Sequence, residues 1–167
     1  ASAYRFSTLA NIGEDRSLRD RLPEYEYTIP QIIAHPVLGI GMGASYRPYD
    51  SRLDWPGNNL QRFTHNAHLW LMMKTGLIGY MCMMWLSVVF LMRAFRYWRQ
   101  IPNLELRGMV LGFAIIYVGV LFASFVNPIL MEYYWTPVIG LMMGVSELAI
   151  RDTIAARTAQ VDGSSIA

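Results

Sequence analysis

The chain has 167 residues, of which 54% are hydrophobic and 16% charged, and its formal net charge is only +2. That charge is small and no basic cluster is interleaved with aromatics, so we expect no nucleic-acid partner. Residues 1–66 carry seven Arg and seven Asp or Glu, whereas residues 75–92 and 108–131 carry no charge. The sequence therefore predicts an all-α membrane protein with a polar front and a membrane-embedded back, and we expect it to be a fragment of a longer polytopic protein.

Residues 1–66 are expected to form a loop segment outside the membrane, with one amphipathic helix at about residues 24–35. There, apolar residues recur at spacings of four, three and one, which is typical of one helical face, and the polar residues face away from it. Such a helix is expected to lie on the membrane surface or to pack on other spans. The apolar face comprises Tyr25, Ile29, Ile32 and Ile33, and the polar face comprises Glu24, Glu26, Thr28 and Gln31.

The first transmembrane helix is predicted at residues 67–98. Residues 75–92 are 18 uncharged and mostly large apolar residues, and the run extends back to Leu69 if Lys74 snorkels. Trp70 and Trp98 lie near the two ends, where amphipathic aromatics settle in a bilayer.

Two further helices are predicted after a loop at residues 99–107. Residues 108–127 form the second span, with small residues that allow close helix approach. Residues 133–150 form a third helix that either spans or is re-entrant, because its uncharged run is only the 14 residues 133–146. Residues 151–167 are the tail.

The distribution of arginines predicts the orientation. Four arginines lie within residues 93–107 and two more, Arg151 and Arg157, lie in the tail, whereas residues 127–132 have neither Lys nor Arg. The loop and the tail are therefore expected in the cytoplasm, and residues 1–66 and 127–132 outside.

His65 is the leading catalytic candidate, because it lies directly before the first span and an imidazole can take a proton from a hydroxyl nucleophile near neutral pH. Asn66 could orient it or bind substrate, and Arg62 is a further candidate for substrate binding. His65 could instead be a solvated or capping residue. His65 and His68, at i and i+3, could also share a metal, but residues 62–74 hold no Cys, Asp or Glu to complete such a site.

Arginines of the front segment are candidates for binding phosphate, because a guanidinium fork matches phosphate geometry in a bidentate way. Arg16 and Arg21 belong to this run, together with Arg19. The alternative is a solvated run balanced by neighbouring acids.

Several motifs occur here in a characteristic order. Arg21 is followed four residues later by Tyr25, then by "IIAHPVLGIGMG", a loop at residues 44–64, "HNAHL" and "TGLIGY". Together they resemble the C-terminal part of the bacterial O-antigen ligase and polymerase family, over roughly residues 16–95.

The resemblance implies a GT-C-like glycosyltransferase of the bacterial inner membrane, multi-pass, with its active site facing the periplasm. It implies an undecaprenyl-diphosphate-linked glycan donor, a lipid A-core or glycan acceptor, and no metal or cofactor. His65 would be the base for the acceptor hydroxyl, and Arg21 would bind the donor diphosphate. Because many spans form the donor groove in that family, the 167-residue chain alone is expected to be inactive.

Two other classes remain open. A transporter fragment would carry ionisable residues within its spans, and residues 75–92 and 108–131 have none. A non-catalytic membrane scaffold would not need the series of Arg21, "GIGMG" and "HN".

Overall fold

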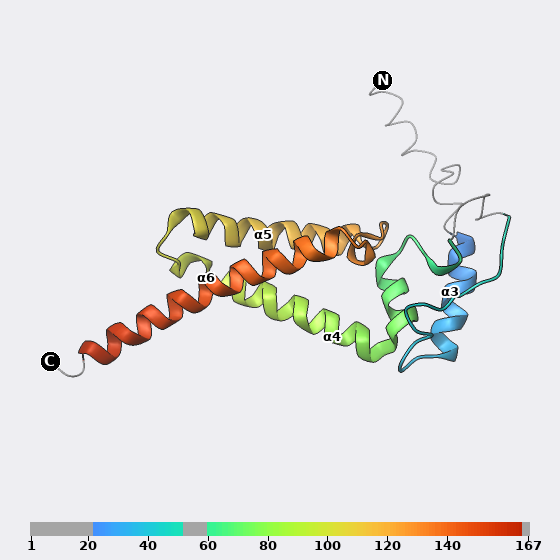
Figure 1. The fold of residues 1–167 in the computed structure, drawn as a ribbon, viewed down its shortest axis with the longest axis horizontal. Helices are drawn as coiled ribbons and strands as arrows, with labels where there is room; N and C mark the ends of the chain where they lie inside the picture. The colour runs from blue at the N-terminus through green and yellow to red at the C-terminus, as the bar shows by residue number, and fades with distance from the viewer. Residues whose placement is uncertain (1–21, 52–59, 165–167) are drawn as a thin grey trace, which may run out of the picture. The chain divides into compact units, whose positions relative to one another are not determined.

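The structure, a computed structural model, describes residues 22–51 and 60–164, and the elements of this part of the chain are all helical (Figure 1). The predicted all-α class is confirmed for these residues. The chain divides into two compact units, Ala1–Tyr80 and Met81–Ala167. The boundary falls inside α4 (Ala67–Tyr97).

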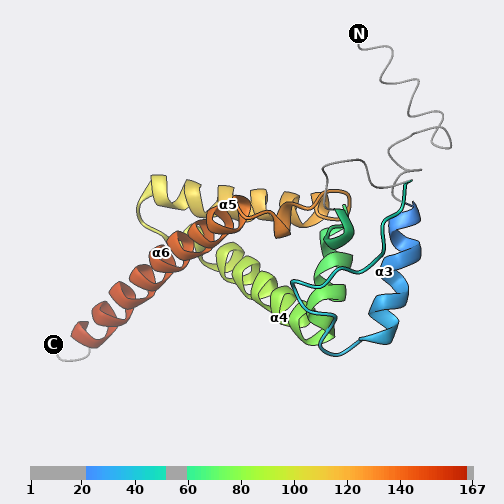
Figure 2. The ribbon, with the colours of Figure 1, turned by 45° about the vertical axis from the view of Figure 1, so that its right-hand side comes forward.

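The first unit contains α3 (Leu22–Ala34), the short 3₁₀ helix η2 (Leu60–Arg62) and the beginning of α4. In both ribbon views α3 lies beside the first turns of α4 (Figure 2). Glu24 lies in the first turn of α3, where a negative charge is favourable beside the positive end of the helix dipole.

Two residues of the polar face of α3, Glu24 and Thr28, are buried within this unit, whereas Glu26 of the same face is exposed. Glu24 is 3% exposed and Thr28 is fully buried, whereas Ile33 on the opposite face is 73% exposed. The sequence predicted two faces for this helix, with the polar residues directed away from the apolar face. Two of these polar side chains have hydrogen-bond partners inside the unit: the Thr28 hydroxyl donates to the Glu24 carbonyl at 2.8 Å, and Gln31 Nε2 donates to the Tyr46 carbonyl at 3.3 Å.

A break in α4 holds in place the connector, residues 35–51, which follows α3. Gly76 has φ 66° and ψ −171°, so α4 consists of two helical pieces joined at this residue. Such a break frees carbonyls at the end of one piece and N–H groups at the start of the next. Residues 36–41 meet both: the N–H groups of Ile40 and Gly41 donate to the carbonyls of Met73 and Lys74 at 2.9 and 3.0 Å. The N–H groups of Leu77 and Ile78 donate to the carbonyls of Pro36 and Val37 at 2.8 and 3.4 Å.

Two glycines make this close crossing possible. Gly39 and Gly76 both have positive φ, and a Cβ on Gly76 would lie 2.2 Å from the Val37 carbonyl oxygen. A Cβ on Gly39 would lie 2.5 Å from the Lys74 carbonyl carbon. Gly39 of "HPVLGIG" and Gly76 of "TGLIG" therefore serve one contact between two backbones.

The second unit contains the rest of α4, η3 (Trp98–Gln100), α5 (Leu104–Ala123), η4 (Ile129–Met131) and α6 (Trp135–Ser164). Asn103 caps α5, because its side-chain oxygen accepts from the N–H groups of Glu105 and Leu106 at 2.9 and 3.2 Å.

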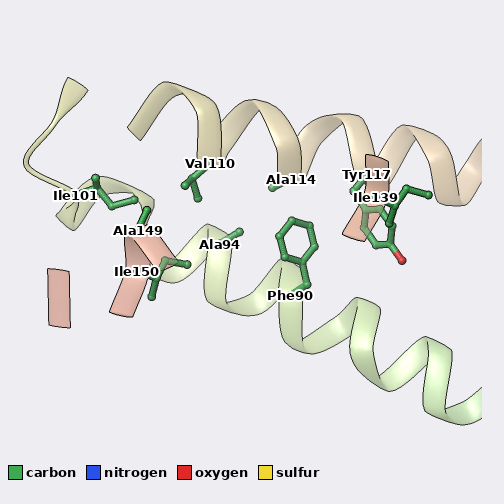
Figure 3. Close-up of a cluster of buried hydrophobic side chains, with 9 residues drawn as sticks. All are labelled: Phe90, Ala94, Ile101, Val110, Ala114, Tyr117, Ile139, Ala149 and Ile150. Carbon is green, nitrogen blue, oxygen red and sulfur yellow. The ribbon is translucent and has the colours of Figure 1, made fainter. Parts of the chain in front are cut away.

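A hydrophobic cluster joins α4, α5 and α6 in this unit, and Figure 3 shows Phe90 of α4 directed toward α5. The rings of Phe90 and Tyr117 pack edge to face with centroids 5.4 Å apart, and the hydroxyl groups of Ser87 and Tyr117 are 2.7 Å apart. The Arg93 guanidinium donates to both carboxylate oxygens of Glu147, at 2.8 and 3.0 Å. A bidentate ion pair thus ties α4 to α6 and neutralises Glu147.

Within residues 22–51 and 60–164, two helices are long and apolar enough to cross a membrane, at Ala67–Gln100 and Leu104–Ala123. Large apolar side chains on both are exposed, among them Trp85 and Phe122, as is expected of a surface that lipid covers. These two helices support the membrane class predicted from the sequence. For residues 133–150, which lie largely in α6, spanning remains a prediction.

We predict that Gly76→Ala destabilises the first unit. An L residue in this region of φ and ψ costs about 1–3 kcal/mol through the backbone alone, and the added Cβ would also overlap the Val37 carbonyl. Thermal unfolding of the detergent-solubilised protein should show a lower midpoint. Gly43→Ala is the matched control, since Gly43 lies in the same connector and a Cβ there meets nothing within 4 Å. Equal thermal unfolding midpoints for the two variants would contradict the close backbone crossing at Gly76.

Candidate functional site

A buried carboxylate and a partly exposed imidazole meet where α3 lies beside the start of α4. His65 Nδ1 is 2.7 Å from Glu24 Oε1, and the His65 backbone N–H donates to Glu24 Oε2 at 2.9 Å. The His65 side chain is 42% exposed, whereas that of Glu24 is almost fully withdrawn from solvent. The contact therefore places one side of the ring in the protein and leaves part of it accessible.

The surroundings of Glu24 favour its charged form. Burial by itself raises the pKa of Glu24, but hydrogen bonds from the His65 side chain and backbone, the charge of His65 and a hydrogen bond from Thr64 together outweigh it. The pKa of Glu24 therefore lies below its ordinary value, and the carboxylate is ionised near neutral pH.

Tyr46 supports the segment that carries His65. Its side chain is buried, and its hydroxyl donates to the Phe63 carbonyl at 3.0 Å while its backbone N–H donates to the Gln61 carbonyl at 3.0 Å. The Tyr46 carbonyl also accepts from Gln31 of α3. Tyr46 of the connector thus links α3 to residues 61–63, which precede α4. The Phe63 ring packs edge to face against His65, with centroids 5.7 Å apart.

Asn66 caps α4. Its Oδ1 accepts from the Leu69 N–H at 3.1 Å and its carbonyl accepts from the Trp70 N–H at 2.9 Å, which is the pattern of an N-cap residue. The Trp70 indole donates to the Arg62 carbonyl at 2.8 Å, and the Arg62 residue is exposed. Two of the predicted substrate-binding residues, Asn66 and Arg62, therefore flank His65, and the side-chain oxygen of Asn66 already has a structural partner.

His68 lies apart from this contact. It is buried, its ring packs edge to face against Tyr80, and its Nδ1 is 3.4 Å from the Tyr80 hydroxyl. Within residues 22–51 and 60–164, no three side chains of His, Cys, Asp or Glu are grouped to hold a metal ion. Lys74 does not snorkel to solvent as the sequence analysis allowed; it is buried and its amine donates to the Ala44 carbonyl.

The structure brings His65 together with a residue that the sequence analysis assigned only to a polar helix face. Glu24 lies 41 positions before His65, and no local motif joins them. The available signal was the spacing of Glu24, Thr28 and Gln31 at i, i+4 and i+7, because such a polar stripe requires partners if it is buried. The other predicted site residues, Arg16 and Arg21, lie outside the residues that the structure describes.

Comparison with known proteins gives one family match. The model of the family described as O-antigen ligase matches residues 2–84, about half of the chain. This range includes α3, the connector, His65 and the break in α4. The match confirms the family resemblance of the motifs. No curated protein and no solved structure matches the chain.

We predict that Asn66→Ala lowers stability through loss of the helix cap, by about 0.5–2 kcal/mol. Asn66→Ser should restore most of that loss, because a hydroxyl also accepts from the N–H groups of the first turn. Thermal unfolding measures the stability, and activity of the full-length protein, normalised to folded protein, measures function. If Asn66→Ser is as stable as wild type but inactive, Asn66 contacts substrate as well; if Asn66→Ala keeps full stability, the cap has no energetic role.

Proposed function

Because the chain belongs to the O-antigen ligase family, we propose that it is part of an integral membrane glycosyltransferase that moves a glycan from an undecaprenyl-diphosphate carrier to a sugar hydroxyl. The family implies a membrane role in glycan ligation or polymerisation. The proposed acceptor is lipid A-core, for ligation, or another glycan, for polymerisation.

The observation that carries this proposal is the position of His65 and the partial exposure of its ring. Its ring is partly exposed directly before the N-terminal end of an apolar helix long enough to cross a membrane. A lipid-linked substrate presents its head group at that level of a bilayer. An imidazole there can accept the proton of an acceptor hydroxyl while the hydroxyl oxygen bonds to the anomeric carbon. The bond between that carbon and the diphosphate oxygen breaks, and the lipid diphosphate leaves with the electron pair.

The departing diphosphate gains negative charge, which must be stabilised as the bond breaks. We assign this role to Arg21, because a planar guanidinium can bind phosphate oxygens through two parallel hydrogen bonds. Arg16, Arg62 and Asn66 are the proposed substrate-binding residues. In this mechanism fixed arginines replace a metal ion, and the complete site includes spans beyond the 167 residues, so that this chain alone is inactive.

We predict that His65→Gln abolishes transfer and leaves binding of the donor lipid intact, because a base acts on the acceptor. The loss should be about 10²-fold to 10⁴-fold, the usual contribution of a general base. The measurement is transfer from a radiolabelled lipid-linked glycan by the full-length protein in proteoliposomes, normalised to protein level.

His68→Gln is the control for this experiment. The His68 ring faces Tyr80, so its replacement should retain most activity, and a chelator should have no effect. Wild-type transfer by His65→Gln would remove the central residue of the proposal. Inhibition by a chelator, together with inactivity of His68→Gln, would indicate instead that the two histidines share a metal.

We predict that residues 1–66 and 127–132 face the periplasm of the bacterial inner membrane and that residues 93–107 and the tail face the cytoplasm. The basis is the clustering of Arg93, Arg96, Arg99 and Arg107. In a Cys82→Ser background, an impermeant thiol reagent added to intact cells should label a cysteine at position 49 and not one at position 100. The reverse pattern would overturn the orientation and place His65 on the wrong side for a periplasmic acceptor.

A further inference from the structure

Glu24 is a carboxylate whose two oxygens both face one residue. It is 3% exposed, and its Oε1 and Oε2 lie 2.7 and 2.9 Å from the Nδ1 and the backbone nitrogen of His65. Withdrawing an ionised carboxylate from water is costly unless hydrogen bonds compensate it, so these two contacts, together with the hydrogen bond from Thr64, account for the tolerance of a charge here. A purely structural salt link on a surface would not require this burial.

We propose that Glu24 is a positioning residue for His65: it holds the ring with Nδ1–H toward the carboxylate, so that Nε2 is the nitrogen that takes the proton from the acceptor hydroxyl. This inference rests on the proposed function of His65 and names the partner and the ring nitrogen through which it acts.

The geometry carries the assignment in two steps. An ionised carboxylate only accepts hydrogen bonds, so the Nδ1 at 2.7 Å must be the donor. A neutral imidazole has a single N–H, so its other nitrogen, Nε2, then carries the free lone pair. The bond from the His65 backbone to the same carboxylate fixes where the residue sits, and the edge-to-face contact with Phe63 limits rotation of the ring.

The proton balance follows from this arrangement. The acceptor hydroxyl gives its proton to Nε2 as its oxygen bonds to the anomeric carbon, and the resulting imidazolium lies against the Glu24 carboxylate, which stabilises the positive charge. The lipid diphosphate leaves with the electron pair of the broken bond. The imidazolium afterwards releases the proton to water, because its side chain is 42% exposed.

The test compares Glu24→Gln with Glu24→Asp in the full-length protein in proteoliposomes. The Gln amide can turn its NH₂ group toward Nδ1 and select the tautomer with the proton on Nε2, which cannot act as a base. We expect kcat to fall on the order of 10²-fold to 10⁴-fold while KM for the donor and acceptor is unchanged. Glu24→Asp keeps an ionised acceptor and should recover part of kcat.

Nitrogen-15 NMR of histidine-labelled protein, with His65 assigned by subtraction of the His65→Gln spectrum, should show the change of tautomer in Glu24→Gln.

A double-mutant cycle separates positioning from a merely structural role. If Glu24 acts through His65, Glu24→Gln costs no further kcat in the His65→Gln background, because residues that act as a unit are strongly non-additive. Equal losses of kcat from Glu24→Gln in both backgrounds would overturn the proposal, as would wild-type kcat and an unchanged His65 tautomer in Glu24→Gln. Wild-type kcat of His65→Gln by itself would instead overturn the proposed function of His65, so the two failures are distinguishable.

Thr28→Val is the control for loss of a buried polar contact on the same helix. The Thr28 hydroxyl donates to the backbone carbonyl of Glu24, one turn away from the carboxylate contact. Its loss should lower thermal stability and leave kcat and the His65 tautomer as in wild type. A loss of kcat in Thr28→Val as large as that in Glu24→Gln would show that disturbance of α3, rather than the carboxylate, determines activity, and would overturn the proposal.

Discussion

A helix that breaks inside an apolar environment must find partners for the backbone groups that the break releases, and this constraint organises the first unit. Four hydrogen bonds with residues 36–41, two donated and two accepted by that segment, supply those partners on both sides of Gly76. The connector can approach so closely only because Gly39 and Gly76 lack side chains. Since the connector follows directly after α3, the same crossing keeps α3 beside the start of α4, and therefore keeps Glu24 within reach of His65.

The site depends on this scaffold rather than on local sequence. His65 lies one residue before the cap of α4, and its segment is held to the connector by Tyr46 and to α3 by Glu24. Each link joins parts of the chain that are distant in sequence, so the position of the imidazole is the result of several weak constraints acting together. In the proposed mechanism this support keeps the His65 ring oriented while one side of it remains open to the acceptor.

The second unit differs from the first in how its polar and apolar side chains are distributed. Helices α4, α5 and α6 share one apolar cluster, while large apolar side chains elsewhere on α4 and α5 point outward. The hydroxyl groups of Ser87 and Tyr117 are hydrogen-bonded between the helices, and the charges of Arg93 and Glu147 are paired there. Polar groups are thus paired inward and apolar groups face outward, which is the arrangement that hydrocarbon favours.

Composition and pattern alone determined the membrane class and the helical content, because apolar runs of about 20 residues are properties of the chain itself. The family was indicated by the resemblance of the ordered motifs. The importance of His65 as a candidate also came from its place before such a run. The partnership with Glu24 was decided only by tertiary structure, because 41 residues and a backbone crossing separate the two side chains. The same holds for α3: its periodicity predicted two faces, but the burial of Glu24 and Thr28 depends on partners that only the fold supplies.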